Sequence, residues 1–369
     1  MPATAYPPPV ALEIRDDVPL APLTTLELGG RARHFVDAAD DDAILEALRW
    51  ADSRRLPIAI LGGGSNLVVA DAGFPGLVIR IGTRGRRFER TSISGQVALT
   101  ATAGEPWDDL VAETVARDLA GLECLSGIPG RVGATPIQNV GAYGQEVADT
   151  IRSVRVLDRG TLQIRELAPA DCAFAYRDSR FKREPDRFVI LAVTFELRLG
   201  GAPTLRYREL AEALAGTAKP SLSQVRSTVL ALRRKKSMVL TEDDPNRRSV
   251  GSFFTNPIVS AAEAAEVATR AHSAGLLAAD ADLPRWPADG GRVKLSAGWL
   301  IERAGFPKGL RRGPVGLSAA HALALVHHGG GSASALVDLA REIRDTVRAR
   351  FGVTLVPEPT FLGLSWPAV

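Results

Sequence analysis

Residues 61–71 read LGGGSNLVVAD and decide how the first half of the chain is interpreted. The run before them, PIAIL at 57–61, is apolar and has the length of a buried strand. Three glycines then let bare backbone amides approach a phosphate and bond its oxygens. The residues after the loop, LVVA, again favour a strand. The stretch predicts a strand, a glycine-rich turn and a second strand, and both a phosphate-binding turn and a plain tight turn stay open at this point.

Two common nucleotide-binding motifs do not fit this loop. A GxGxxG motif that begins at Gly62 needs glycine at position 67, where the chain has Leu67, and it needs a helix where a strand is expected. A Walker A loop fails as well, because no GK[ST] follows the glycines. The loop is therefore neither a Rossmann fingerprint nor a P-loop.

A second glycine-rich stretch covers residues 121–149 and reads GLECLSGIPGRVGATPIQNVGAYGQEVAD. It has no clear helical or strand period, and structureless loops of that length are uncommon unless they bind something. Together with the first loop it suggests a large, flat, phosphorylated ligand.

In the rest of the chain, predicted strands and helices alternate up to about residue 238, and the pattern then becomes mostly helical with loops. Strands are expected at 76–81, 96–104 and 187–197, the last as a central strand, and a hairpin at 154–158 and 161–167. Helices are expected at 40–55, 105–120, 222–238, 260–275 and 332–352. The helix at 40–55 should bury a face with Ile44, Leu45 and Leu48, and the one at 260–275 carries a capping box, Ser260 with Glu263. Residues 353–364 again have the residue pattern of a strand.

Length, charge and cysteine content limit the class of protein. A chain of 369 residues suits two or three domains, and its net charge of +3 comes from basic and acidic residues mixed along the sequence. This mixture gives no nucleic-acid arm or polybasic membrane patch. The two cysteines form neither a CxxC pair nor a zinc pattern, and no stretch approaches the ~20 apolar residues of a membrane helix. We expect a soluble, cytoplasmic protein with no metal site.

Six motifs carry a resemblance to one family. They are LGGGSNLVVAD, GIPGRVGATPIQNVGAYG, YRDSRFK, GSFFTNP, KLSAGWLIERAG and VPEP. They occur in the order found in the UDP-N-acetylmuramate dehydrogenases, also called UDP-N-acetylenolpyruvoylglucosamine reductases, and the chain resembles that family over about residues 20–364. The joint occurrence of these motifs is highly specific, whereas composition and spacing alone identify no substrate.

The resemblance implies an α+β protein with a two-subdomain FAD-binding fold of the vanillyl-alcohol oxidase (PCMH) type and a smaller α+β substrate-binding domain. The expected bounds are 1–84 for the first FAD-binding subdomain, 85–237 for the second, joined by 353–369, and 238–352 for the substrate-binding domain. From its pattern alone, the segment 238–352 is mostly helical with loops.

FAD, held non-covalently, is the implied cofactor, and NADPH is the implied hydride donor. By the likeness, the first loop cradles the FAD diphosphate and residues 129–143 line the rest of the flavin. None of the five histidines lies in either loop, which disfavours a tethered flavin. The expected FAD contacts are Leu61, Gly62, Gly63, Gly64, Ser65, Asn66, Leu67, Pro129, Gly130, Gly133, Ala134, Gln138, Asn139, Gly141, Ala142, Tyr143 and Ile190.

The implied reaction is a hydride relay from NADPH to FAD and then to the vinyl carbon of UDP-N-acetylenolpyruvoylglucosamine, a step of peptidoglycan precursor synthesis that yields UDP-N-acetylmuramate. Negative charge develops on the neighbouring carbon and its carboxylate, so that the site needs donors aimed there. Arg177 matches the family's arginine, which can bind a carboxylate through two N–H groups. Glu358 matches its glutamate, which must be protonated to assist and is therefore expected to have a raised pKa.

Ser252, in GSFFTNP, matches the serine with which the family protonates the carbanionic carbon. The residue pattern alone also allows a turn or cap residue or a hydrolase nucleophile. The nucleophile is disfavoured because the stretch is not GxSxG and no histidine lies near it in sequence.

The resemblance assigns four residues to substrate binding. Tyr207 lies on a loop expected to close over the substrate diphosphate, Lys236 and Arg248 are expected at the same diphosphate, and Asn256 at the uridine or sugar. Lys236 also fits a solvated basic cluster at a helix end.

Four further residues are kept out of the expected site. Trp286 and His321 stand where some members have tyrosine and glutamine, and they either contact ligand or only pack. Asp178 and Lys182 are expected to pair with each other and hold Arg177.

Two other functions are open to test. One is an oxidase of sugars or alcohols on the same fold, and the other is a nucleotide-binding or scaffold protein without turnover. The joint presence of Arg177, Ser252 and Glu358 disfavours the second, because a binding module needs no proton donor for a carbanion. Small-molecule substrates and a monomeric protein are expected.

Overall fold

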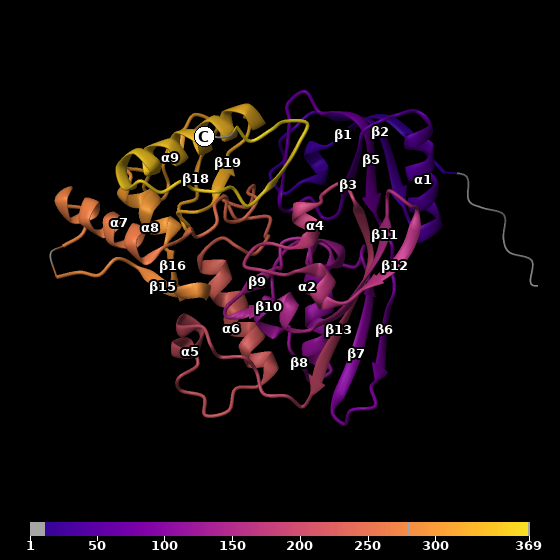
Figure 1. Ribbon diagram of the computed structural model, residues 1–369, viewed down its shortest axis with the longest axis horizontal. Helices are drawn as coiled ribbons and strands as arrows, with labels where there is room; N and C mark the ends of the chain where they lie inside the picture. The colour runs from indigo at the N-terminus through magenta and orange to yellow at the C-terminus, as the bar shows by residue number, and fades with distance from the viewer. Residues whose placement is uncertain (1–11, 279, 368–369) are drawn as a thin grey trace, which may run out of the picture.

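The computed structural model describes residues 12–278 and 280–367, and Figure 1 shows their arrangement. Long strands form the right-hand side of the molecule in that view, and the helices of the C-terminal third lie together at the upper left. Residues 1–11 of the first expected domain and residues 368–369 of the tail lie outside the described residues.

The first sheet has the strand order β1-β2-β5-β3. Its strands are β1 (Arg15–Pro19), β2 (Arg31–Ala38), β5 (Phe74–Ile81) and β3 (Ile58–Leu61). The pairs β2–β5 and β3–β5 are parallel, and helix α1 (Asp41–Ser53) packs on β2 and β5. Asp40 caps α1 by accepting from the Ala43 amide at 2.8 Å, and Ile44 and Leu48 are buried as predicted, whereas Leu45 is only partly buried.

The second sheet is antiparallel and follows the order β12-β11-β13-β7-β6, with β8 paired to β13. Its strands are β6 (Arg86–Arg90), β7 (Gln96–Thr102), β8 (Leu119–Ala120), β11 (Ile151–Asp158), β12 (Gln163–Leu167) and β13 (Phe188–Leu199). The predicted hairpin is β11–β12, and the predicted central strand is β13, which pairs with β11 on one side and β7 on the other. Both of these predictions are confirmed.

Helices α2 and α6 lie against the glycine-rich segment after β8. The helices that follow the second sheet's strands are α2 (Trp107–Ala116), α3 (Pro169–Cys172), α4 (Arg180–Arg183), α5 (Arg208–Ala213) and α6 (Leu222–Lys235). Asp108 of α2 accepts two hydrogen bonds from Arg226 of α6, at 2.6 and 2.8 Å. The predicted basic last turn of α6 is present as Arg233, Arg234 and Lys235.

The C-terminal third contains the two predicted long helices and more strand than its pattern indicated. Its helices are α7 (Ala261–Ser273), α8 (Ala297–Arg303) and α9 (Ala333–Phe351). The capping box is present, since the Glu263 amide donates to Ser260 Oγ and the Ser260 amide donates to Glu263 Oε2. Two small sheets accompany them, built from β14 (Ile258–Val259), β15 (Arg285–Ala288), β16 (Arg292–Leu295), β17 (Arg311–Arg312), β18 (Val315–Leu317) and β19 (Leu325–His327). Strands of two to four residues are too short to show a period, so the mostly helical interpretation was wrong here.

The tail returns to the first half of the chain. Strand β20 (Thr360–Leu362) pairs in parallel with β4 (Leu67–Val69), which directly follows the first glycine loop. We expected residues 353–369 to join 85–237, whereas this pairing is made within 1–84. A three-residue strand does not reveal its partner through its own sequence, which is why the pattern could not distinguish the two.

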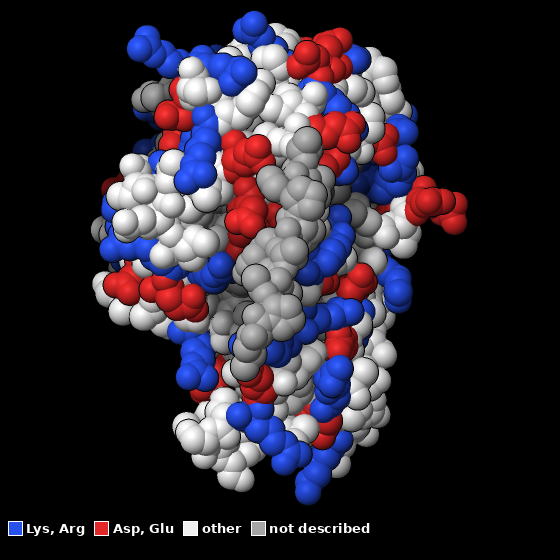
Figure 2. Space-filling model, turned by 90° about the vertical axis from the view of Figure 1, so that its right-hand side faces the viewer, with Lys and Arg blue, Asp and Glu red and all other residues white. Residues whose placement is uncertain are grey.

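Basic and acidic side chains are interspersed over the face shown in Figure 2, in line with the mixed charges of the sequence. No helix within residues 12–278 and 280–367 combines the length and the apolar character that a membrane span needs.

Candidate active site

The first glycine loop joins β3 to β4, and its shape depends on two glycines. Gly64 has a φ of +62°, and a Cβ there would collide with the carbonyl oxygen of Leu23. A Cβ on Gly63 would lie 2.7 Å from the Cα of Gly130. Side chains at these positions would therefore either strain the backbone or push the two glycine loops apart.

The backbone amides of this loop are available to a ligand. Among the hydrogen bonds between described residues, no amide from Gly62 to Asn66 donates to a protein acceptor. Successive amides of this kind form a concave anion-binding site, and buried amides left without any partner are rare in folded proteins. The loop therefore fits a diphosphate, which would supply the missing acceptors.

The two glycine loops, predicted separately, are in direct contact. Ser65 Oγ donates to the carbonyl of Pro129 at 3.1 Å, and Asn66 Nδ2 donates to Gln138 Oε1 at 3.0 Å. Asn66 Nδ2 also lies 3.3 Å from the carbonyl oxygen of Glu358, in the tail segment. The structure therefore brings the expected cofactor loops and the VPEP motif into one region.

The second loop is ordered by short elements and by buried side chains. It contains a 3₁₀ turn at Val132–Ala134 and the hairpin β9 (Gly141–Ala142) and β10 (Gln145–Glu146). Asn139 is buried, and its side chain bonds Glu146, the Ala175 carbonyl and the Ala148 amide. The Asn139 side chain thus holds the loop together, which leaves its backbone as the part able to meet FAD.

The remaining expected FAD contacts border these loops. Leu61 ends β3, Leu67 begins β4, and Ile190 is buried in β13, on which the 3₁₀ turn packs. A Cβ on Gly133 would meet the Cβ of Ala103 at 2.5 Å, so glycine is required for the turn to lie against the end of β7. These residues adjoin the two glycine loops, and their contact with FAD stays a prediction.

Arg177 lies in a tight turn with strained backbone. Its φ of +54° is left-handed, which is uncommon for a residue with a side chain and is found often at functional sites. Its Nη2 donates to the Gly141 carbonyl at 2.6 Å, and its Nε lies 3.3 Å from Glu358 Oε1. A Cβ on Gly141 would meet Glu146 Cγ at 2.8 Å and the Gln145 carbonyl oxygen at 3.0 Å, and it would also crowd the guanidinium at 3.1 Å. The side chain is thus held between the second glycine loop and the tail.

The expected Asp178–Lys182 pair is only half correct. Lys182 does hold Arg177, because its Nζ donates to the Arg177 carbonyl at 3.0 Å. Asp178, however, pairs with Arg183. A sequence window that contains both Lys182 and Arg183 does not indicate which of the two cations the turn will bring to Asp178.

The segment that carries Ser252 is bonded to two segments from distant parts of the chain. The amide of the next residue, Phe253, donates to the Leu323 carbonyl at 2.7 Å, and the Phe253 carbonyl accepts from the Glu358 amide at 2.8 Å. The side chains of Phe253 and Phe254 are fully buried and pack against Trp366. The FF pair in GSFFTNP therefore anchors the backbone, and Ser252 lies one residue before the pairing with Glu358.

The carboxyl of Glu358 has the raised pKa that its expected role requires. Burial raises this pKa, and the charges of Arg177 and Lys182 and a hydrogen bond from Gln138 oppose the shift without cancelling it. The group thus retains a proton at higher pH than an ordinary glutamate.

Tyr207 and Lys236 both lie against Tyr143 of the second glycine loop. The rings of Tyr207 and Tyr143 meet edge to face with centroids 5.3 Å apart, and Lys236 Nζ lies 5.8 Å from the Tyr143 ring centroid. Lys236 Nζ also donates to Glu209 Oε2 at 2.5 Å. Tyr207 is 43% exposed, so its hydroxyl can reach a ligand from solvent.

The other two expected substrate residues are engaged with the protein. Arg248 forms an ion pair with Glu27, which also pairs with Arg247. Asn256 Oδ1 accepts from the Ala297 amide at 3.0 Å, in the first turn of α8. Contact of either residue with a substrate stays a prediction.

His321 belongs beside the catalytic candidates, although the sequence argument left it out. Its Nε2 lies 3.4 Å from Ser252 Oγ. Burial lowers the pKa of His321 to about 4, with further lowering by Lys236, Lys308 and Arg233. The sequence does not reveal this contact, because the two residues are far apart along the chain. The one indication that His321 belongs to the site was its match to a family glutamine. Trp286, the other residue set aside, is 47% exposed on β15.

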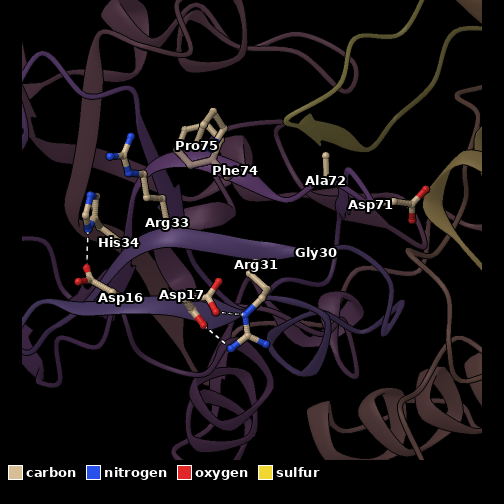
Figure 3. Close-up of a pocket in the computed structure, with 10 residues that line it drawn as sticks. All are labelled: Asp16, Asp17, Gly30, Arg31, Arg33, His34, Asp71, Ala72, Phe74 and Pro75. Atoms are coloured by element: carbon tan, nitrogen blue, oxygen red, sulfur yellow. Dashed lines mark hydrogen bonds and ion pairs between the residues drawn. The ribbon is translucent and has the colours of Figure 1, made fainter.

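One hollow in the described part of the chain lies away from this region. Its volume is about 660 Å³, and Figure 3 shows it on the first sheet, lined by Asp16, Asp17, Arg31, Arg33, His34 and Phe74 among others. Asp16 pairs with His34 at 2.6 Å and Asp17 with Arg31 at 2.8 Å. None of the expected site residues lines it.

Comparison with known proteins identifies both parts of the chain. A family model described as "FAD binding domain" matches residues 32–165, and one described as "UDP-N-acetylenolpyruvoylglucosamine reductase, C-terminal domain" matches residues 243–362. The expected order of an FAD-binding part and a second α+β part is thereby confirmed.

Relatives of known name match nearly the whole chain. The UDP-N-acetylenolpyruvoylglucosamine reductase of Streptomyces coelicolor is 50% identical over 354 residues, which cover 95% of this chain and 90% of the relative. That of Saccharopolyspora erythraea is 51% identical and covers 93% of this chain and 94% of the relative. Among solved structures, the reductase of the same name from Thermus caldophilus matches with a TM-score of 0.62 and 25% identity, covering 95% of this chain and 98% of that one.

Proposed function

The chain belongs to the UDP-N-acetylenolpyruvoylglucosamine reductase family, and from this premise we infer that it is an FAD-dependent oxidoreductase of peptidoglycan synthesis. It reduces the enolpyruvyl group of UDP-N-acetylenolpyruvoylglucosamine to give UDP-N-acetylmuramate, with NADPH as hydride donor. The observation that carries this function is the near full-length identity of about half of all residues to reductases of that name.

FAD is the resident cofactor, and the residues present fit it. The unpartnered amides from Gly62 to Asn66 suit its diphosphate, and the second glycine loop, in contact with the first, suits the flavin. When bound, FAD accepts hydride from NADPH and delivers it to the vinyl carbon of the substrate. The protein itself must bind, orient and protonate.

Arg177 is proposed to bind the substrate carboxylate. Hydride addition leaves negative charge on the carbon beside that carboxylate, and the charge delocalises into it. A guanidinium held by the Gly141 carbonyl and by Glu358 is fixed in position before the reaction, so little reorganisation is needed when the charge develops. The left-handed backbone of Arg177 supports this role, because such strain is tolerated where a side chain must be aimed.

Ser252 is proposed to protonate the carbanionic carbon. A hydroxyl is a weak acid, so it can do this only when the acceptor is strongly basic, close, and shielded from water. The pairing of Phe253 with both Leu323 and Glu358 fixes the backbone on which the hydroxyl is carried.

Glu358 is proposed to act in its protonated form, as a donor to the enolate-like carboxylate or as an acid. Its raised pKa supports this, and the neighbouring Arg177 ties the two groups to the same part of the substrate. Tyr207 and Lys236, which both lie against Tyr143 of the second loop, are proposed to bind the substrate diphosphate. Arg248 and Asn256 are proposed as further substrate contacts.

The place of the protein and its internal bounds are also proposals. We propose a cytoplasmic, monomeric enzyme with three parts, at 1–84, 85–237 and 238–352. The C-terminal family model, which begins at residue 243, supports the start of the third part.

Anaerobic absorption spectroscopy tests the function in one cuvette. The purified protein should carry the visible absorption of an oxidised flavin that acid releases, lose it on addition of NADPH, and regain it on addition of UDP-N-acetylenolpyruvoylglucosamine. Reoxidation by the substrate is the decisive step, because an oxidase or a binding module would not perform it. A flavin that remained attached to the acid-precipitated protein would support the oxidase instead.

A further inference from the structure

The loop that carries His321 is bonded to the segment that carries Ser252. This loop lies between β18 and β19, and it is closed by hydrogen bonds from Ser318 N to the Ala324 carbonyl at 2.8 Å and from Ala324 N to the His321 carbonyl at 3.1 Å. The Leu323 carbonyl accepts the Phe253 amide at 2.7 Å. The position of His321 relative to Ser252 is thus set by backbone bonds on both sides of the contact.

The ring of His321 is electrically neutral where it meets Ser252. It is partly buried, and the charged groups that face it are cations: Arg233 and Lys236 at the end of α6, and Lys308 in the loop after α8. A neutral imidazole carries a single N–H, which either nitrogen can hold. If Nε2 holds it, the ring donates to Ser252 Oγ, and the hydroxyl hydrogen of the serine is free to point elsewhere.

We propose that His321 is a positioning residue for Ser252, which it serves by donating its Nε2–H to Oγ so that the serine hydroxyl hydrogen is directed at the substrate carbon. The proposal rests on the function assigned to Ser252 above. The distance of 3.4 Å between Nε2 and Oγ is at the long end for a hydrogen bond, and such contacts at catalytic groups often shorten when substrate is bound.

The same contact stabilises the charge that Ser252 acquires. In the protonation step the serine O–H bond breaks, the carbanion's electron pair forms the new C–H bond, and the negative charge passes to Oγ. The Nε2–H of His321 then donates to an alkoxide, and a hydrogen bond to a charged oxygen is about twice as strong as one to a neutral oxygen. A water molecule returns the proton to Oγ after the product leaves, so His321 begins and ends the cycle neutral.

Stopped-flow measurement of the two half-reactions tests the proposal in the FAD-loaded enzyme. His321→Ala should slow the limiting rate of flavin reoxidation by UDP-N-acetylenolpyruvoylglucosamine by about 10- to 100-fold, as expected for one hydrogen bond to a charged oxygen. Flavin reduction by NADPH should not change. His321→Gln should keep most of the reoxidation rate, because its amide nitrogen can donate from a similar position. In a Ser252→Ala background, His321→Ala should cause no further loss.

Three results would overturn the proposal. The first is a weaker substrate affinity of His321→Ala with an unchanged limiting rate, which would make His321 a substrate contact only. The second is a loss of equal size in the wild-type and Ser252→Ala backgrounds. The third is an unchanged reoxidation rate in Ser252→Ala, which would remove the role proposed for Ser252 itself. If Ser252→Ala is slow and His321→Ala is not, the role of Ser252 stands and that of His321 does not.

Discussion

The two halves of the proposed active site are built from different kinds of chemical group. The cradle at Gly62–Asn66 uses backbone amides, and its shape depends on positions where no side chain fits. The cluster of Arg177, Ser252 and Glu358 uses side chains, and it depends on backbone pairings among segments that are far apart in sequence. The cradle should therefore be sensitive to the addition of a single methyl group, whereas the cluster should tolerate changes of size and fail when its chemistry changes.

The largest effect is expected in the cradle. Gly64→Ala should destabilise the fold by about 1–3 kcal/mol and release FAD, because alanine has to adopt a left-handed φ of +62° and its methyl group meets the Leu23 carbonyl. Thermal unfolding and the visible absorption of the purified protein measure the two consequences.

Gly62→Ala is the matched control for that variant. The nearest atom to a Cβ there is 3.8 Å away, which is an ordinary contact, so the protein without FAD should keep its stability. Equal destabilisation of the two FAD-free variants would show that the conformation of Gly64 is not the cause.

In the cluster, Ser252→Ala removes the proposed proton donor and changes little else. We expect flavin reduction by NADPH to proceed nearly as in the wild type and reoxidation by the enolpyruvyl substrate to slow by at least ~10²-fold, the usual contribution of a general acid. Rapid-mixing absorption measurements separate the two rates. Equal losses in both half-reactions would instead indicate misfolding or loss of FAD.

Arg177→Lys distinguishes charge from geometry. Lysine meets the same backbone strain at this left-handed position and keeps the positive charge, but it cannot form two parallel hydrogen bonds to a carboxylate. Reoxidation should slow by roughly 10-fold, the value of one charge-assisted hydrogen bond. A variant as fast as the wild type would show that Arg177 contributes only its charge.

The smallest effect is a pH dependence. If protonated Glu358 is the active form, the reoxidation rate should be constant at low pH and fall as pH rises through the raised pKa of this carboxyl. By linkage, folding stability should also fall between the ordinary value of 4.5 and that raised pKa, because the folded protein holds a proton that the unfolded chain has lost. Glu358→Gln, which cannot ionise, should remove both dependences, and a profile unchanged in this variant would assign them to another group.

The backbone cradle and the side-chain cluster also differ in how far they could be predicted from the sequence. The strand-loop-strand at 61–71 and the central strand β13 follow from local composition, since glycines and β-branched runs determine the structure of their own segment. The sequence indicated both glycine loops but not that they touch. The sheets of the C-terminal third were missed because their strands are too short to show alternation. The resemblance, rather than any spacing, supplied the roles of Arg177, Ser252 and Glu358.

The sequence does not indicate which side chain or strand pairs with which. Nothing local distinguishes Lys182 from Arg183 as the partner of Asp178, or β4 from the second sheet as the partner of β20. The contact between Ser252 and His321 spans 69 positions and arises only when Leu323 pairs with Phe253. Such choices are made by tertiary packing, and one of them concerns Ser252, a residue proposed to do the chemistry.

The bond from Asn66 to the Glu358 carbonyl joins residues 292 positions apart, and Thr360 donates its amide to the Asn66 carbonyl at 3.0 Å. During synthesis on the ribosome, the glycine loop emerges early. Its far end is fixed only when this later segment has been made and can bond to it. The flavin site therefore cannot be completed before Glu358 and Thr360 have been made. A chain that stalls before Glu358 should be a poor competitor for cellular FAD.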